Sequence, residues 1–407
     1  MTDAFIDRNF AREVAFLKSL VRVPSDNPPG DCAPHADAAA RLLMKLGFKV
    51  ERHKVPDALA RRHGMMSVVN LVVRERFGKG RGPVIALNAH GDVVPPGDGW
   101  SVDPYGAVES KGAIYGRGAA VSKSDFATYA FALLALKAAP SGLEGTVELH
   151  FTYDEEAGGF VGPKWLLDRR ISKPDLAMSA GFSYAIVTAH NGCLHLEITV
   201  RGKQAHAAMP ESGADALEAA TAVLHALYRE RDRLGRRRSK IAGIGSPQLN
   251  VGLISGGINT NVVPDRIVMR LDRRIIPEER ATRVEQALIK AVQAATRGRR
   301  GITVTCRRIL LAEPLRPTAG VKRLIAPLER HAARVLRTPI EVKGVPLYTD
   351  ARHYSVRGIP TVLFGAGPRS ILDANAHAAN EHIRLSDLKS ATRIVAATLR
   401  DLLAPAK

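Results

Sequence analysis

Residues 83–100 read PVIALNAHGDVVPPGDGW, and this stretch decides the fold class. Its apolar run ends in a turn rich in Gly and Pro, which is typical of a buried strand. Similar runs alternate with segments of helical periodicity, so we predict an α/β fold with a mostly parallel sheet flanked by helices. Ligands of such folds bind beyond the carboxyl ends of the strands. The predicted strands are 67–73, 83–88, 146–153 and 176–179, and the predicted helices are 13–21, 34–46 and 124–137.

The order of elements changes between residues 191 and 310, where we predict strand, helix, strand, strand, helix and strand. This order is the split βαβ pattern of a small α+β domain. The α/β pattern then resumes with helices at 317–336 and 385–403. We therefore expect residues 1–190 and 311–407 to form one domain and residues 191–310 to form an inserted second domain. The six inserted elements are predicted at 193–201, 214–234, 247–255, 264–275, 279–296 and 302–310.

The composition is that of an ordinary globular protein, because 45% of the 407 residues are hydrophobic and 24% are charged. This balance excludes disordered, collagen-like and coiled-coil proteins. Three cysteines, Cys32, Cys193 and Cys306, are too few and too far apart for a disulfide framework or a cluster of thiolate zinc ligands. The most apolar run, Phe126 to Leu136, is about half the length of a membrane-spanning helix. We expect a cytoplasmic protein without a membrane segment.

The positive charge is uneven. Lys and Arg number 59 and Asp and Glu number 40, which gives a net charge of +19. Basic residues are concentrated at 229–240 and 297–300, and such a patch can bind nucleic acid or an acidic surface. No aromatic residues are interleaved with them and no nucleic-acid-binding module is recognisable. A solvated basic surface is therefore the preferred interpretation, and nucleic acid is not expected as a partner.

Two motifs place ionisable side chains directly after predicted strands. In the stretch quoted above, His90 follows the strand and Asp92 lies two residues later, so the imidazole can bind a metal that the carboxylate supports. In HFTYDEEAGGF, the adjacent carboxylates of Asp154, Glu155 and Glu156 repel one another unless a cation or solvent relieves them. One carboxylate can then bind the ion while its neighbour acts as general base. Taken alone, each motif also fits a structural histidine or a solvated acidic turn.

Two further motifs contain histidine, namely GKQAHAAMP with His206 and ANAHAANEH with His377. A single histidine is more often structural than catalytic. Together with NAHGDVVPPGDGWSVDPYGAVESKGAIYGRGAA, YDEEAGG, GGINTNVVPD, LDRR, YTDAR and FGAG, however, these motifs run in order along nearly the whole chain. The set closely resembles the zinc metallopeptidase family of aminoacylase, carboxypeptidase G, acetylornithine deacetylase and succinyl-diaminopimelate desuccinylase.

The resemblance implies roles for individual residues of the larger domain. It implies that His90 binds one metal ion and that Asp92 supports this ligand. It implies that Glu155 is the general base and that Glu156 and His377 bind a second ion. These residues are predicted as the catalytic and metal-binding set of the larger domain.

The resemblance also implies roles for the inserted domain. It implies that His206 reaches the partner subunit's active site and stabilises the oxyanion, and that Asn261 and Arg274 hold a carboxylate of the substrate. A homodimer formed through the inserted domain is implied, and a larger oligomer remains open. The expected partner is therefore a small carboxylated substrate.

The sequence departs from the family pattern at two metal ligands. Where the family carries GRGAxDMKG, with an Asp that bridges both ions, this chain reads GRGAAVSKS and has Val121 at the bridging position. The acidic ligand expected after the strand at 176–179 is replaced by Ala180 and Gly181. Neither position offers a side-chain oxygen. Two dications about 3.5–4 Å apart require a bridging anion, so the usual metal pair is not expected.

We therefore predict one divalent ion per subunit, either zinc or manganese, bound by His90, Glu156 and His377 with water in an open position. Asp125 lies one helical turn after Val121, and residues four apart share a helix face. It is the candidate replacement ligand.

The leading functional prediction is a metal-dependent hydrolase with a single bound ion, which cleaves a C–N bond of a small carboxylated compound with metal-activated water. Glu155 serves as the general base. One alternative is an aminohydrolase that removes ammonia from an activated aromatic amino acid such as 5-nitroanthranilate. A second alternative, motivated by the two lost ligands, is a metal-free pseudoenzyme or ligand-binding relic.

Overall fold

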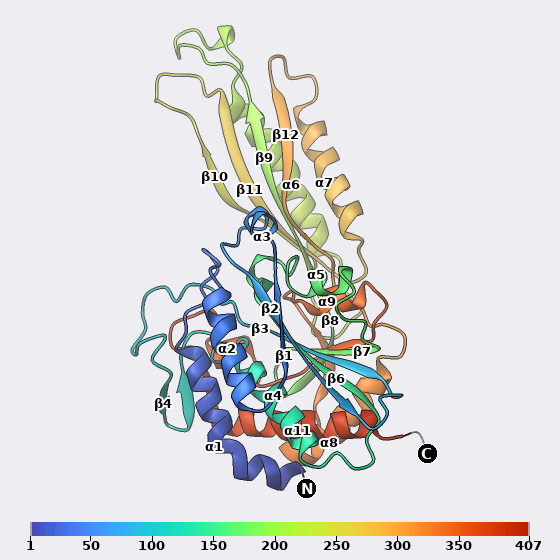
Figure 1. Ribbon diagram of the computed structural model, residues 1–407. Helices are drawn as coiled ribbons and strands as arrows, with labels where there is room; N and C mark the ends of the chain where they lie inside the picture. Colours follow the sequence, from blue (N-terminus) through green and yellow to red (C-terminus); the bar gives the residue numbers. More distant parts are fainter. Residues whose placement is uncertain (1, 406–407) are drawn as a thin grey trace. The chain divides into compact units, whose positions relative to one another are not determined.

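The protein is described by a computed structural model that covers residues 2–405. Contacts divide the chain into two compact units, which are both visible in Figure 1. The first unit contains the chain up to Thr188, residues 317–343 and the chain from Thr349 onward. The second contains residues 189–316 and 344–348. Each unit has its own cluster of buried hydrophobic side chains.

The large sheet consists of β1 (Val50–Lys54), β2 (Val69–Phe77), β3 (Val84–His90), β6 (Gly145–Thr152), β7 (Leu176–Ser179), β8 (Ala185–His190), β13 (Glu341–Val345) and β14 (Thr361–Leu363). The strand order is β1-β2-β6-β3-β7-β14-β8-β13. Strands β6, β3, β7 and β14 run parallel, whereas β2 pairs antiparallel with both β1 and β6, and β8 pairs antiparallel with β14. A small separate sheet comprises β4 (Val108–Ser110), β5 (Ala113–Tyr115) and β15 (His382–Arg384). The predicted mostly parallel α/β sheet is confirmed.

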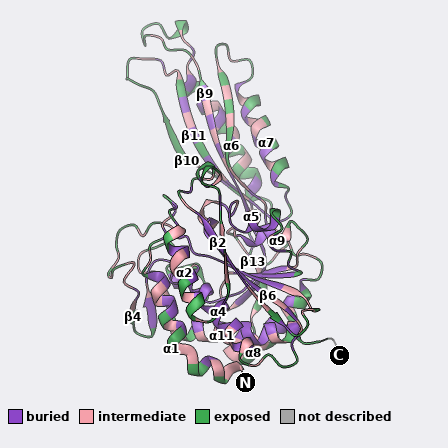
Figure 2. Ribbon diagram, in the orientation of Figure 1, coloured by how far each residue is buried: buried purple, intermediate pink, exposed green. Residues whose placement is uncertain are grey.

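Helices cover both faces of this sheet. The helices of the first unit are α1 (Thr2–Val21), α2 (Ala33–Lys45), α3 (Asp57–Arg62), α4 (Lys123–Lys137), α5 (Pro163–Asp168), α8 (Lys322–Leu336), α9 (Ala351–Ser355), α10 (Ile371–Ala374) and α11 (Leu385–Leu403). Alternate residues of β3 show the two faces, because Ile85 packs into the main core while Ala86 packs with Leu167 of α5 and Tyr354 of α9. In Figure 2 the central strands are drawn as buried.

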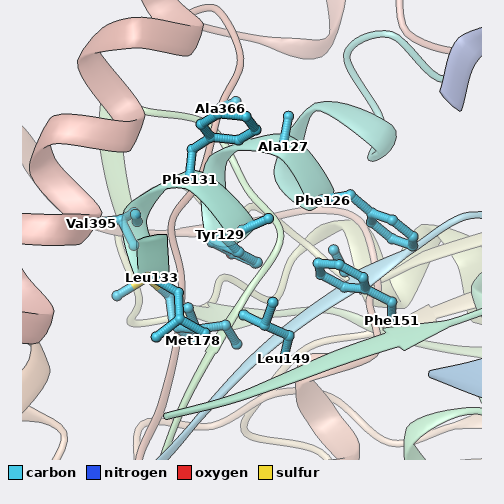
Figure 3. Packing of buried hydrophobic residues seen from close by; sticks show 14 of the residues in the cluster. Phe126, Ala127, Tyr129, Phe131, Leu133, Leu149, Phe151, Met178, Ala366 and Val395 are labelled. Carbon is cyan, nitrogen blue, oxygen red and sulfur yellow. The ribbon is translucent and has the colours of Figure 1, made fainter. Parts of the chain in front are cut away.

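Helix α4 is the central helix of the first unit and begins two residues after Val121. It is buried on nearly all sides and is apolar for most of its length after Asp125, as expected of a helix enclosed by other elements. Its Phe126 ring stacks on Phe151 of β6, with ring centroids 3.8 Å apart, and Leu149 and Met178 lie beneath Tyr129 and Leu133 (Figure 3). This packing anchors the chain next to the loop that precedes the helix.

The second unit is an antiparallel sheet with the order β10-β11-β9-β12 and two packed helices. Its elements are β9 (Gly192–Arg201), α6 (Ala216–Gly235), β10 (Gln248–Gly256), β11 (Arg266–Ile275), α7 (Ala281–Thr296) and β12 (Thr303–Ala312). Leu194, Leu196 and Ile198 alternate along β9 and pack with α6 and α7, whereas the residues between them face away from this core. Asp215 caps α6 by accepting the amide N–H groups of Leu217 and Glu218.

Among residues 2–405, none of the helices is both long enough and apolar enough to span a bilayer.

Candidate metal centre and active site

His90 is the last residue of β3, at the carboxyl end of the parallel strands. Its Nδ1 lies 2.9 Å from the main-chain oxygen of Asp92, to which it can donate a proton. This contact leaves Nε2 as the nitrogen that can bind a cation. The Asp92 carboxylate is 3.5 Å from the ring and accepts the amide N–H groups of Glu155 at 3.2 Å and Glu156 at 3.1 Å. Asp92 therefore joins the two predicted motifs, and its support of His90 runs mainly through its backbone.

Glu155 and Glu156 lie in a short 3₁₀ turn, Glu155–Ala157, that follows β6. Ligand atoms of His90, Glu155 and Glu156 all lie within 4.8 Å of one another, and we call these three residues the acidic cluster. His377 Nε2 lies 3.2 Å from Glu156 Oε1, and about half of the His377 side chain is exposed. The fold thus brings together four residues that are separated by up to 287 positions in the sequence.

Negative charge is crowded around the acidic cluster. Burial raises the pKa of Glu155 well above its ordinary value, and the neighbouring carboxylates raise it further against the opposing effect of His90. Burial also raises the pKa of Asp350 to about 6. The pKa of His90 rises well above its ordinary value because, against burial, Asp92 and the two glutamates favour the imidazolium. Without a metal ion, the raised pKa values favour protons on these groups, and a divalent cation would take the place of that positive charge.

The donors present fit a divalent ion. One imidazole nitrogen and carboxylate oxygens are the ligands of catalytic zinc sites. Two buried oxygens beside the cluster, Asp154 Oδ1 and Asp350 Oδ1, have no hydrogen-bond partner. Buried polar atoms without partners are costly, and a cation relieves this cost by attracting them electrostatically.

The position that corresponds to the bridging Asp of the family is apolar. Val121 packs with Ala120, Phe182, Ala374 and Ala376. At Gly181, an added side-chain carbon would lie 3.0 Å from the amide nitrogen of Phe364, which leaves little room for a longer side chain. Hydrocarbon and backbone thus surround the two positions where the family has acidic ligands.

Asp125, the candidate replacement ligand, is buried on α4. Its Oδ1 accepts the amide N–H of Ala366 at 2.7 Å, and burial raises its pKa well above the ordinary value against the opposing effects of Ala366, His90 and Gly181. A side chain at Gly365 would collide with the same oxygen. Among the described residues, Asp125 does not belong to the acidic cluster, and backbone amides already bind its carboxylate.

Glu381 is a residue of this region that our sequence reasoning missed. Its carboxylate is buried, accepts the amide N–H groups of Ala120 at 3.0 Å and Val121 at 3.1 Å, and pairs with Arg117 at 2.6 Å. It therefore holds the loop that carries Val121. Glu381 lies in the letters ANEH shortly after His377, so a motif search could have singled it out. Only the fold shows which groups its carboxylate binds.

The predicted residues of the inserted domain lie in the second unit. His206 is exposed, and it forms an antiparallel bridge with Val262 next to Asn261. The main-chain oxygen of Asn261 accepts the amide N–H of Ala207 at 3.0 Å, so His206 and Asn261 lie in neighbouring segments. Arg274 lies near the end of β11, where its Nε is 2.9 Å from Asp272 Oδ1.

Comparison with known families and sequences agrees with the motifs. Residues 86–401 match the family described as peptidase family M20/M25/M40. The chain is 30% identical over 375 residues to acetylornithine deacetylase of Myxococcus xanthus, covering 89% of this chain and 90% of that protein. It is 28% identical over 397 residues to succinyl-diaminopimelate desuccinylase of Granulibacter bethesdensis, covering 95% and 97%.

Solved structures share the fold at low sequence identity. Aminopeptidase PepT of Bacillus cereus superposes with a TM-score of 0.74 at 23% identity, covering 97% of this chain and 99% of that one. The YXEP protein of Bacillus subtilis, described as a dinuclear metal-binding peptidase, superposes with a TM-score of 0.70 at 15% identity, covering 98% and 99%. These likenesses support the architecture of the whole chain.

Proposed function

The chain belongs to peptidase family M20/M25/M40, a family of metal-dependent hydrolases that act on C–N bonds, and from this premise we propose that it works with a single divalent ion and with Glu155 as general base. The ion is zinc or manganese. Its proposed ligands are His90, Glu156 and His377. Two observations support this ligand set: ligand atoms of His90 and Glu156 lie within 4.8 Å of each other, and His377 Nε2 lies 3.2 Å from Glu156 Oε1.

A divalent ion held there supplies Lewis-acid polarisation of the substrate carbonyl and makes a bound water more acidic. The protein's own groups do the remaining work. The main-chain oxygen of Asp92 orients the His90 ring, and the Asp92 carboxylate holds the turn of Glu155 and Glu156 through their amides. The reacting groups are thereby fixed before the substrate arrives.

Glu155 takes a proton from the attacking water and passes it to the leaving nitrogen. A general base works best when its pKa lies near the working pH, and burial together with the surrounding carboxylates raises the pKa of Glu155 in that direction. A dication held by the neighbouring ligands would favour the ionised form of Glu155. Glu155 acts as base in its ionised form, and its buried setting favours acceptance of a proton.

One observation carries the single-ion proposal, namely the apolar surroundings of Val121. We test it by Val121→Asp, which restores a bridging carboxylate, with Val121→Asn as the uncharged control of similar size. Elemental analysis after saturation with zinc should find about one more ion per chain in Val121→Asp than in wild type. Equal content in both proteins would contradict the proposal, provided that both are folded by circular dichroism.

We further propose, from the family resemblance, a small carboxylated substrate held by Asn261 and Arg274, with His206 stabilising the oxyanion in the partner of a cytoplasmic homodimer. The dimer forms through residues 191–310. His206→Ala and Glu155→Gln are each expected to inactivate the protein, and mixed dimers of the two variants should regain one working site. Mixed dimers without activity would argue against action across subunits. N-acetylated and N-succinylated amino acids are the first substrates to try, since the relatives named above are a deacetylase and a desuccinylase.

The two alternative functions are not favoured. The similar sequences are named as deacylases, and the chain keeps an imidazole and two carboxylates in one cluster. A ligand-binding relic has no need for a base of raised pKa beside a set of metal ligands.

A further inference from the structure

A second group of metal-ligand side chains lies in the second unit, on the two central strands of its sheet. Cys193 and His195 are two apart on β9, and Asp272 and Arg274 are two apart on β11. The antiparallel register pairs His195 with Asp272 and Cys193 with Arg274. All four side chains therefore project from the same face, opposite to the face that packs against α6 and α7.

Three of these side chains converge on one point. Cys193 Sγ lies 3.2 Å from His195 Nε2, His195 Nε2 lies 3.0 Å from Asp272 Oδ2, and Cys193 Sγ lies 3.7 Å from Asp272 Oδ2. Zinc bonds of about 2.0–2.1 Å to nitrogen and oxygen and about 2.3 Å to sulfur place the ligands of a tetrahedral site roughly 3.3–3.6 Å apart. The observed separations lie on either side of this range, so small side-chain rotations accommodate an ion.

The same geometry argues against a nucleophilic relay. In a Cys–His–Asp triad the thiol and the carboxylate contact different ring nitrogens, so that a proton can pass through the imidazole. Here the thiol and the carboxylate both face Nε2 of His195. One nitrogen carries at most one proton and can donate it to only one of these two neighbours. A cation at this point satisfies all three groups at once.

The surroundings complete a metal site. Arg274 Nε lies 2.9 Å from Asp272 Oδ1, which orients the carboxylate and leaves Oδ2 toward the sulfur and the imidazole. Partners of this kind hold metal ligands in position in many proteins. Cys193 is buried, whereas 35% of the His195 side chain and 30% of the Asp272 side chain are exposed. Water can therefore reach the remaining coordination position.

We propose that Cys193, His195 and Asp272, hereafter the strand cluster, form a zinc site in addition to the ion of the active site. Thiolate and imidazole favour zinc over magnesium, calcium and manganese, whose preferred ligands are oxygen atoms. The bound ion links β9 to β11 and, through Asp272, fixes the side chain of Arg274. All three ligands come from the second unit, so the site does not depend on the proposed reaction.

Cobalt titration of the full-length protein tests this site without an activity assay. Protein stripped with a chelator and loaded with Co²⁺ should show a sulfur-to-cobalt charge-transfer band in the near ultraviolet, because the strand cluster contains a thiolate and the acidic cluster contains none. Cys193→Ser should abolish the band and lower the zinc content by about one ion per chain. Cys306→Ser is the matched control, since Cys306 is the other cysteine of the second unit and packs against its core.

Two further variants separate this proposal from the active-site proposal. Glu156→Gln should lower the metal content and keep the band. His195→Ala keeps the thiol and should weaken cobalt binding at the band at least tenfold, while His225→Ala, on the exposed side of α6, should change nothing. The proposal is overturned if wild-type protein shows no band, or if the band persists unchanged in folded Cys193→Ser and His195→Ala.

Discussion

The acidic cluster and the strand cluster use similar side chains in opposite settings. The acidic cluster lies at the carboxyl ends of the parallel strands β3 and β6, where burial and like charges raise the pKa of Glu155. The strand cluster lies on two paired strands. There burial raises the pKa of Asp272, but His195 and Arg274 outweigh it and lower that pKa below the ordinary value. A carboxylate among carboxylates is suited to moving protons, whereas a carboxylate held by an arginine and an imidazole is suited to holding a fixed structure.

The largest expected effect comes from a variant that removes the general base of the acidic cluster and keeps its metal ion. Glu155→Gln should lower kcat about a thousandfold on any N-acylated amino acid that the wild type hydrolyses, because it removes the general base. Metal content should remain that of wild type. Glu329→Gln, an exposed position on α8, is the control. Loss of the ion together with activity would instead make Glu155 a ligand.

A smaller effect distinguishes the ligands of the acidic cluster from their neighbours. His377→Ala should weaken zinc binding about a hundredfold, since it removes one of three protein ligands. Asp125→Asn should leave zinc binding unchanged, because backbone amides already bind that carboxylate. Competition with a chromogenic chelator measures both affinities. The reverse ranking would identify Asp125 as the third ligand and His377 as a bystander.

A third contrast is the opposite pH response of the two regions in chelator-treated protein. Asp350, next to the acidic cluster, has a pKa of about 6 in the folded protein, raised by burial from 3.8. Between pH 4 and 6 the unfolded chain releases this proton while the folded chain keeps it, so stability falls as the pH rises. Asp350→Asn mimics the protonated acid and should therefore raise stability at pH 7 by about 3 kcal/mol at most, and hardly at pH 4.

Asp272 has the opposite sign, because its pKa is lowered in the folded protein. Its contribution is present above the pKa of the unfolded chain and is lost as the pH falls through the folded pKa. Asp272→Asn should accordingly lower stability at pH 7 and have little effect in strong acid. Calorimetry of both variants at matched pH values tests the contrast. Parallel pH profiles for the two variants would show that the two regions do not differ in this way.

Elements with strong periodicity could be predicted from the sequence. The prediction for 176–179 agrees with β7 and that for 385–403 with α11, and the predicted 124–137 differs from α4 by one residue at its start. The strands β8 and β13 were missed. Helix 317–336 was predicted to begin too early, since the residues before Lys322 form turns.

Only those residues of the candidate site that belong to short sequence motifs could be predicted. Letters next to strand ends identified His90, Glu155 and Glu156, because such ends meet at one edge of a parallel sheet. The hydrogen bond from the Val121 amide to Glu381 joins residues 260 positions apart, and the sequence motifs could not predict it. The strand cluster was missed for the same reason, since the pairing of His195 with Asp272 follows from strand register, which the sequence did not specify.

The contacts of Glu381 couple two segments of the candidate site, the one that carries His377 and the one that carries Val121. The segment from Asn375 to Glu381 contains His377 at one end, and at the other end it grips the amides of Ala120 and Val121. A bulky inhibitor that pushes this segment outward must drag the Val121 loop with it. The two segments therefore shift together and not independently. Designed ligands should accordingly be enlarged toward the exposed side of His377 and not toward the segment that Glu381 holds.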